Sequence, residues 1–181
     1  MFTAEEIKIA NSTYRSKGSS VFDKNGNVRS VVARFVVNNI DKDKKILDFG
    51  CGPDFIQGQY LNDLGFNVVG WDFGANKPKD GVNKLEKIYD VVYASNVLNV
   101  ISSLSMLTET LNQIYDCLED GGVFIANYPA SPRKMMISPR DLAGIIKVKF
   151  GGLARQVGGV PSAPVWVFTK PALEKRIKVS A

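Results

Sequence analysis

Two aspartates and a pair of glycines are the residues whose types and spacing could do chemistry. Asp48 precedes Gly50 and Gly52, and Asp72 follows Gly52 by 20 positions. Apolar residues before each aspartate predict two buried strands, joined by a glycine turn and a helix. At this spacing an α/β fold places a carboxylate on the ribose hydroxyls of a bound nucleoside. The sequence therefore predicts a nucleoside-containing ligand.

The residues after the glycine turn narrow the choice of ligand. A dinucleotide site has a third glycine three positions after the second, and here that residue is Phe55. Pro53 suits the first helical position, and Asp54 then adds a negative charge that disfavours a pyrophosphate. A positively charged nucleoside without phosphate fits better. S-adenosylmethionine (SAM) is such a ligand.

The same stretch resembles motif I of the class I, Rossmann-like SAM-dependent methyltransferases. The resemblance starts from Leu47–Gly52, covers residues 45–129 and includes Asp90–Leu98 and Gly121–Asn127. Asn96–Ile101 also resembles a subgroup of compact phage and bacterial members. It implies a three-layer α/β/α sandwich whose mostly parallel sheet ends in a C-terminal antiparallel hairpin. It also implies SAM as cofactor, bound by Asp48, Phe49, Gly50, Cys51, Gly52, Asp72, Phe73, Ser95, Asn96 and Val97.

The resemblance gives several of these residues a role. The glycine turn is expected to hold the methionine and ribose parts of SAM, and Asp72 both ribose hydroxyls. Phe73 is expected to pack on adenine, and Ser95–Val97 to flank the sulfonium or the adenine. For Asp48 two roles stay open: a partner for the ammonium group, or a carboxylate that fixes the glycine turn. Cys51 is expected to be a small packed residue rather than a nucleophile.

The composition excludes several kinds of catalysis. The 181 residues include no histidine and two cysteines, Cys51 and Cys117. Ser-His-Asp and Cys-His units and the commonest catalytic metal sites are therefore absent, and we expect no metal. Methyl transfer from a sulfonium remains open because the methyl group is already activated and alignment supplies much of the catalysis.

The methyl acceptor is not marked by a motif. Ser95–Leu98 lacks the proline and aromatic residue of amino-group DNA methyltransferases, no Pro-Cys pair is present, and the ribose 2′-O set is incomplete. No general base is predicted. The candidate acceptor-binding residues are Tyr128, Ser131, Arg133 and Arg29, with Lys134, Arg15, Ser19 and Ser20 nearby in sequence.

Charge is unevenly distributed along the chain. Residues 1–40 carry 6 basic and 3 acidic groups, residues 41–130 carry 7 and 13, and residues 131–181 carry 10 and 2. Basic flanks around a nucleoside-binding core suit DNA or RNA, and a solubilising surface explains them equally well. The interpretations left open are a methyltransferase acting on nucleic acid or a nucleotide-like acceptor, one acting on a small molecule, and a non-catalytic SAM-binding or SAM-degrading protein.

Length and patterning predict one domain over residues 1–181: an N-terminal helical segment (1–40), a cofactor-binding core (41–130) and a basic C-terminal part of the sheet (131–181). With no signal peptide and no membrane span of ~18 apolar residues, a cytoplasmic protein is expected.

Asn27 is expected to cap a helix, and Ser138–Pro139 to open one. The usual third strand, whose end helps hold the adenine amino group, is expected to be reduced or missing within 74–87. Helices are expected over 4–14, 28–40, 53–64, 104–118 and 172–178, and strands over 45–49, 67–72, 89–94, 123–127, 145–150 and 165–169.

Overall fold

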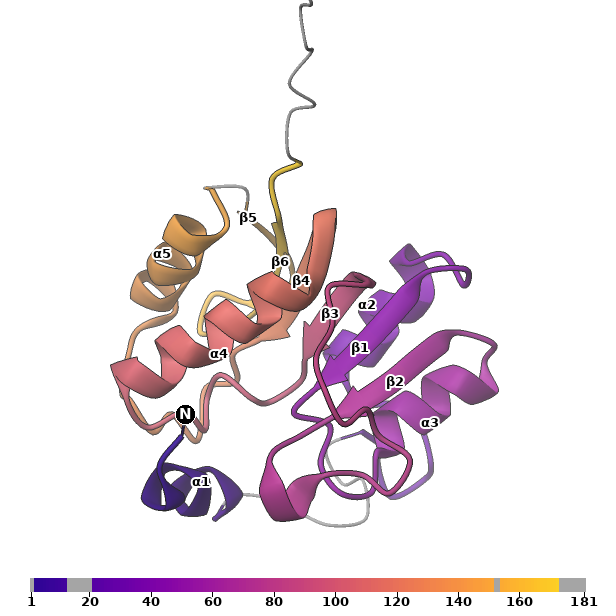
Figure 1. Cartoon of the computed structure of the whole chain (residues 1–181), viewed down its shortest axis with the longest axis horizontal. Coiled ribbons are helices and arrows are strands. Elements are labelled where there is room, and N and C mark those ends of the chain that lie inside the picture. Colours follow the sequence, from indigo (N-terminus) through magenta and orange to yellow (C-terminus); the bar gives the residue numbers. More distant parts are fainter. Residues whose placement is uncertain (1, 13–20, 152–153, 173–181) are drawn as a thin grey trace, which may run out of the picture.

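The structure is a computed structural model that describes residues 2–12, 21–151 and 154–172. A twisted sheet is covered by helices on both faces, as the sequence predicts (Figure 1). The elements are α1 (Ala4–Asn11), α2 (Val31–Asn39), β1 (Lys45–Phe49), α3 (Ile56–Asp63), β2 (Asn67–Trp71), the 3-10 helix η1 (Gly74–Asn76), β3 (Tyr89–Ala94), α4 (Leu104–Cys117), β4 (Leu118–Asn127), α5 (Pro139–Lys149), β5 (Ala154–Val160) and β6 (Ala163–Thr169).

The strand order explains where a site can form. The six strands run β2-β1-β3-β4-β6-β5. The first four in this order are parallel, β6 is antiparallel to β4, and β5 is antiparallel to β6. The carboxyl ends of β1, β2, β3 and β4 therefore meet at one edge, which is where open α/β sheets bind ligands. The predicted fold class and the C-terminal hairpin are confirmed.

Alternation along the strands builds a core on each face of the sheet. On β1, Leu47 and Phe49 pack toward α4 and α5, while Ile46 packs toward α2 and α3. On β3, Val92 packs toward α4 and α5, and Tyr93 packs toward α2 and α3. Successive strand residues point to opposite faces, so a run of consecutive apolar residues places apolar side chains on both sides of the sheet.

The segment after η1 contains no strand and no helix, which confirms the expectation of a reduced third strand. It runs along the outer edge of β2, where the Val82 N–H donates to the Gly70 carbonyl at 3.0 Å. Val82 and Leu85 pack against the core on the α4 side. An irregular segment thus covers the place that a third strand and its helix would take.

One predicted strand is wrong. Residues 145–149 lie in α5, Phe150 is its C-cap, and the strand that pairs with β6 is 154–160. The apolar and basic residues at 146–150 alternate like those of a strand. The Ser138 hydroxyl, however, caps the helix by accepting from the Asp141 N–H at 3.1 Å, and Leu142 and Ile146 are spaced to bury one helical face.

Two predicted helix starts are also wrong. Ser30, not Asn27, caps α2, accepting from the Ala33 N–H at 3.1 Å. Pro53 does not open α3, because Phe55 adopts a left-handed φ of 46° and the helix begins at Ile56. The Phe55 ring lies against Gly58 and Gly70, where added Cβ atoms would come within 1.8 and 2.6 Å of it. Close packing here uses these two glycines rather than a third glycine in the turn. The expected helix over 172–178 lies outside the described residues, apart from residue 172.

Candidate functional site

The loop after β1 and the end of β2 are joined through one carboxylate. Asp72 accepts hydrogen bonds from the Gly52 N–H at 2.7 Å and from the Phe73 N–H at 2.6 Å. Gly50 and Gly52 have φ values of 76° and 72°, which side chains rarely adopt. Burial raises the pKa of Asp72 to about 6, and the two N–H donors partly offset this. In the folded chain, Asp72 therefore lies beside the glycine turn, at the sheet edge where the sequence predicts it.

Asp48 and Phe49 lie beneath this loop and do not line the cavity described below. The Asp48 side chain is on the α2 and α3 face of β1, next to Tyr93. Burial raises the pKa of Asp48 to about 8, and the negative charge of Asp72 adds to the effect, whereas Tyr93 opposes it. Of the two roles open for Asp48, this position favours support of the glycine turn.

Cys51 is half-buried and lines the cavity. Burial raises the pKa of its thiol, and the charges of Asp48 and Asp72 raise it further. The group is therefore held as the neutral thiol, which is a poor nucleophile. This agrees with its predicted role as a packed residue.

The loop after β3 forms the next part of the edge. Asn96 has a left-handed φ of 60°. Its N–H donates to Oδ1 of Asn127 at 2.7 Å, and Nδ2 of Asn127 donates to Oδ1 of Asn96 at 2.8 Å. This reciprocal pair links the ends of β3 and β4 and turns Ser95–Val97 toward the glycine turn. A Cβ atom at Gly50 would lie 2.6 Å from Cγ2 of Val97.

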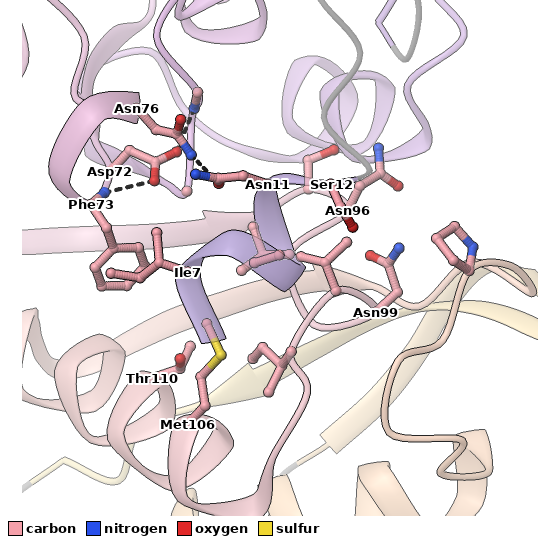
Figure 2. A pocket seen from close by; sticks show the side chains of 18 of the residues that line it. Ile7, Asn11, Ser12, Asp72, Phe73, Asn76, Asn96, Asn99, Met106 and Thr110 are labelled. Atoms are coloured by element: carbon pink, nitrogen blue, oxygen red, sulfur yellow. Dashed lines mark hydrogen bonds between the residues drawn. The ribbon is translucent and has the colours of Figure 1, made fainter. Parts of the chain in front are cut away.

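These loops surround a cavity of about 740 Å³, a volume within the usual range for small-molecule sites, about 300–1,000 Å³. Helix α1 lies across it, and Ile7 and Asn11 face the cavity from this helix (Figure 2). Contacts on both sides hold α1 there, including the ring of Phe2, 4.3 Å from that of Phe73, and the Ser103 hydroxyl, which donates to Glu6. Helix α1 is therefore a wall of the site.

Nine of the site residues predicted from the sequence line the cavity, and other lining residues were missed. The nine are Gly50, Cys51, Gly52, Asp72, Phe73, Ser95, Asn96, Val97 and Ser131. The polar residues that were missed include Asn11, Asn76, Asn99 and Thr110. Asn99 lies within a stretch that resembles methyltransferases, but no local pattern marks the other three.

The candidate acceptor-binding residues are placed differently from one another. Ser131 lines the cavity. Tyr128 is buried, stacks on Trp166 and donates to the Ile137 carbonyl at 3.0 Å. The Arg133 guanidinium lies 4.2 Å from the Tyr128 ring and donates to the carbonyls of Tyr128, Pro129 and Ser162. Arg29 is exposed, and neither it nor Arg133 lines the cavity. Arg15, Ser19 and Ser20 lie outside the described residues.

The side chains that line the cavity include few charged groups. Among the described residues that line the cavity there is no lysine or arginine, and the only acid is Asp72. No group of acids and cysteines in the described ranges could hold a metal ion. No helix in those ranges is long and apolar enough to cross a membrane.

Comparison with known proteins identifies the family to which this chain belongs. The family model described as "Methyltransferase domain" matches residues 23–161. None of the curated proteins matches the chain in sequence.

Several solved structures share the fold. A TehB-like SAM-dependent methyltransferase from Corynebacterium glutamicum superposes with a TM-score of 0.61 at 19% identity, over 81% of this chain and 90% of that one. TehB from Haemophilus influenzae gives 0.56 at 14% identity, over 81% and 64%. A 16S rRNA N2 G1207 methyltransferase from T. thermophilus, in complex with AdoMet and guanosine, gives 0.56 at 10% identity, over 79% and 39%.

Proposed function

We propose that this chain, which belongs to the methyltransferase domain family, transfers a methyl group from SAM to a small organic acceptor held in the cavity beside α1. SAM supplies a methyl group that its sulfonium already activates. The protein therefore has to align the two reactants and exclude water, and no strong general base is required. The lining fits this demand, because it consists of apolar side chains, amides and hydroxyls around one carboxylate.

The residues beside the glycine turn fit SAM itself. Gly50 and Gly52 leave the backbone open to a ligand, since neither carries a side chain. The Asp72 carboxylate can accept hydroxyl hydrogens in addition to its two backbone N–H donors. The Phe73 ring offers a flat apolar surface beside it. Nothing in this loop has the positive charge that would favour a phosphate instead.

The choice of a small acceptor depends on one observation, which is the buried amide oxygen of Asn99. Its side chain lines the cavity and is 3% exposed, and its Oδ1 atom has no hydrogen-bond partner among the described residues. A buried amide oxygen without a partner is costly. A ligand that donates a hydrogen bond would remove this cost. Hydroxyl and amino acceptors of a methyl group carry such a hydrogen.

The alternative is a nucleic-acid acceptor, favoured by the basic flanks of the sequence. The absence of lysine and arginine from the described lining counts against a phosphate-bearing ligand inside the cavity.

A single domain and a reducing cytoplasmic location are also part of the proposal. Both cysteines are free thiols, which suits that compartment.

The test follows the methyl group. The protein is incubated with methyl-labelled SAM and, separately, with a small-metabolite extract, DNA and RNA. We expect label in the small-metabolite fraction. Label in DNA or RNA would instead support the alternative, and no transfer to any fraction would contradict both.

Two variants assign the residues. Asp72→Ala should abolish SAM binding in calorimetry, whereas Asp63→Ala, an exposed aspartate on α3, should not. Asn99→Leu removes the unpaired amide at similar volume. It should lower transfer by about tenfold or more and leave SAM affinity within about twofold of the native protein. Asn38→Ala, an exposed asparagine on α2, is the control, and equal transfer by both variants would remove Asn99 from the site.

A further inference from the structure

Two asparagines from distant parts of the chain form an amide pair on the cavity wall. Asn76 ends η1, and Asn11 ends α1. Nδ2 of Asn76 donates a hydrogen bond to Oδ1 of Asn11, across 65 positions of sequence. Figure 2 shows the pair next to Asp72, away from Asn96 and Asn99. Both side chains are half-buried and line the cavity.

This pair has unused hydrogen-bonding capacity. One bond joins the two amides, and among the described residues Nδ2 of Asn11 and Oδ1 of Asn76 have no partner. The pair therefore offers a ligand in the cavity one donor, Nδ2 of Asn11, and one acceptor, Oδ1 of Asn76. Such a pattern matches a ligand edge on which an amino group lies next to a ring nitrogen.

The surroundings indicate which part of a ligand meets this edge. The glycine turn and Asp72 lie on one side, where the methionine and ribose parts of SAM are proposed to bind. From Asp72 the wall continues through Phe73 to η1, so the group attached to the ribose lies along Phe73. The Phe73 ring is held by edge contacts with Phe2 at 4.3 Å and with Trp71 at 4.4 Å. A flat base packed on this ring would turn its edge toward Asn76.

We propose that the Asn11–Asn76 pair binds the amino edge of adenine. This rests on the assignment of SAM as the methyl donor. No third strand is available to supply a residue for this edge, because 77–88 forms no helix or strand between η1 and β3. Asn76 supplies the acceptor for the amino group, and Asn11 supplies the donor for the adjacent ring nitrogen. Helix α1 thereby becomes part of the cofactor site.

The test compares two probes by calorimetry. One is S-adenosylhomocysteine, and the other is its analogue with hydrogen in place of the 6-amino group. We expect the native protein to prefer the first by about tenfold, the effect of losing one buried hydrogen bond. Asn76→Ala should bind the two probes equally well. Such non-additivity is the mark of direct contact.

Further variants separate contact from a general loosening of the wall. Asn11→Ala, at the end of α1, should weaken binding of S-adenosylhomocysteine and reduce the preference. Glu6→Ala removes the bond to Ser103 that holds α1, so it should weaken both probes by the same factor and keep the tenfold preference. Asn38→Ala should change neither affinity.

The outcomes are distinct. An Asn76→Ala protein that keeps the full preference, or a native protein that has none, overturns the amide-pair proposal and leaves the methyltransferase assignment intact. Failure of the native protein to bind S-adenosylhomocysteine at all overturns both. Loss of preference in Asn76→Ala together with its retention in Glu6→Ala supports the proposal.

Discussion

Asp48 and Asp72 follow similar sequences and end up in different surroundings. Asp72 has two backbone N–H donors and faces a cavity, whereas Asp48 is enclosed between the sheet and the helices α2 and α3. Burial raises both pKa values, to about 6 for Asp72 and about 8 for Asp48. Asp48 is therefore mostly protonated at neutral pH, and it becomes a buried charge only in alkaline solution.

This predicts a pH dependence of stability. The folded protein keeps the Asp48 proton between about pH 4 and 8, where the unfolded chain has lost it, so the free energy of unfolding falls as pH rises through this window. The slope from one such group is about 1.4 kcal/mol per pH unit at most. Asp48→Asn should reduce this slope and be more stable than the native protein at pH 9. Urea unfolding at pH 5, 7 and 9 measures it, with Asp63→Asn as control. Parallel curves for native protein and Asp48→Asn would contradict the prediction.

At the scale of elements, α4 continues into β4 without a loop, since Cys117 and Leu118 are adjacent. The carbonyls at a helix end need partners, and Lys170, just after β6, supplies them. Its ammonium donates to the carbonyls of Tyr115 at 2.7 Å and Leu118 at 2.8 Å. Burial lowers the pKa of Lys170. The C-terminal hairpin is thereby tied to the strand that forms the far side of the site.

Lys170→Met should destabilise the fold, because the buried carbonyl of Leu118 and the partly buried carbonyl of Tyr115 lose their donor. We expect a loss of about 1–3 kcal/mol, seen as a lower urea midpoint with an unchanged slope. The exposed Lys79, replaced by Met, should have no such effect. A Lys170→Met protein as stable as the native one would show that water satisfies these carbonyls.

For the whole molecule, the basic flanks of the sequence favour binding to nucleic acid, whereas the described cavity lining, which contains no lysine or arginine, does not. Among the described basic residues, Arg140, Lys147 and Lys149 belong to α5. None of the three lines the cavity. Any binding of DNA through such charges is non-specific and depends on salt. It should not be coupled to the occupant of the cavity.

A duplex oligonucleotide therefore should leave the affinity for S-adenosylhomocysteine unchanged. Any association with DNA seen at 50 mM salt should weaken by about 10³-fold or more at 200 mM if it involves several phosphates. Calorimetry with and without the duplex checks the first statement, and anisotropy of a labelled duplex checks the second. Coupled binding that survives at 200 mM would favour the nucleic-acid alternative.

The elements that local patterns describe well were predicted from the sequence. Tyr89–Ala94 forms the expected strand because its residues are apolar apart from Asp90 and it has a parallel neighbour on each side. The strand expected at 145–150 failed because its alternation is also compatible with a helix, and the cap at Ser138 decides between them. The start of α3 failed because Phe55 is set by contacts with Gly58 and Gly70, which are made only in the folded chain.

The glycine turn, the carboxylate 20 positions later and the strands that precede each of them could be predicted from the sequence, because backbone conformation and strand burial depend strongly on neighbours in the chain. The folded chain was needed to show that α1 lies across the cavity, that Asn11 meets Asn76, and that Oδ1 of Asn99 has no partner among the described residues. The contacts of α1 span 65 positions to Asn76 and 97 to Ser103. No periodicity or spacing encodes such contacts, because they depend on how the finished sheet and its helices pack.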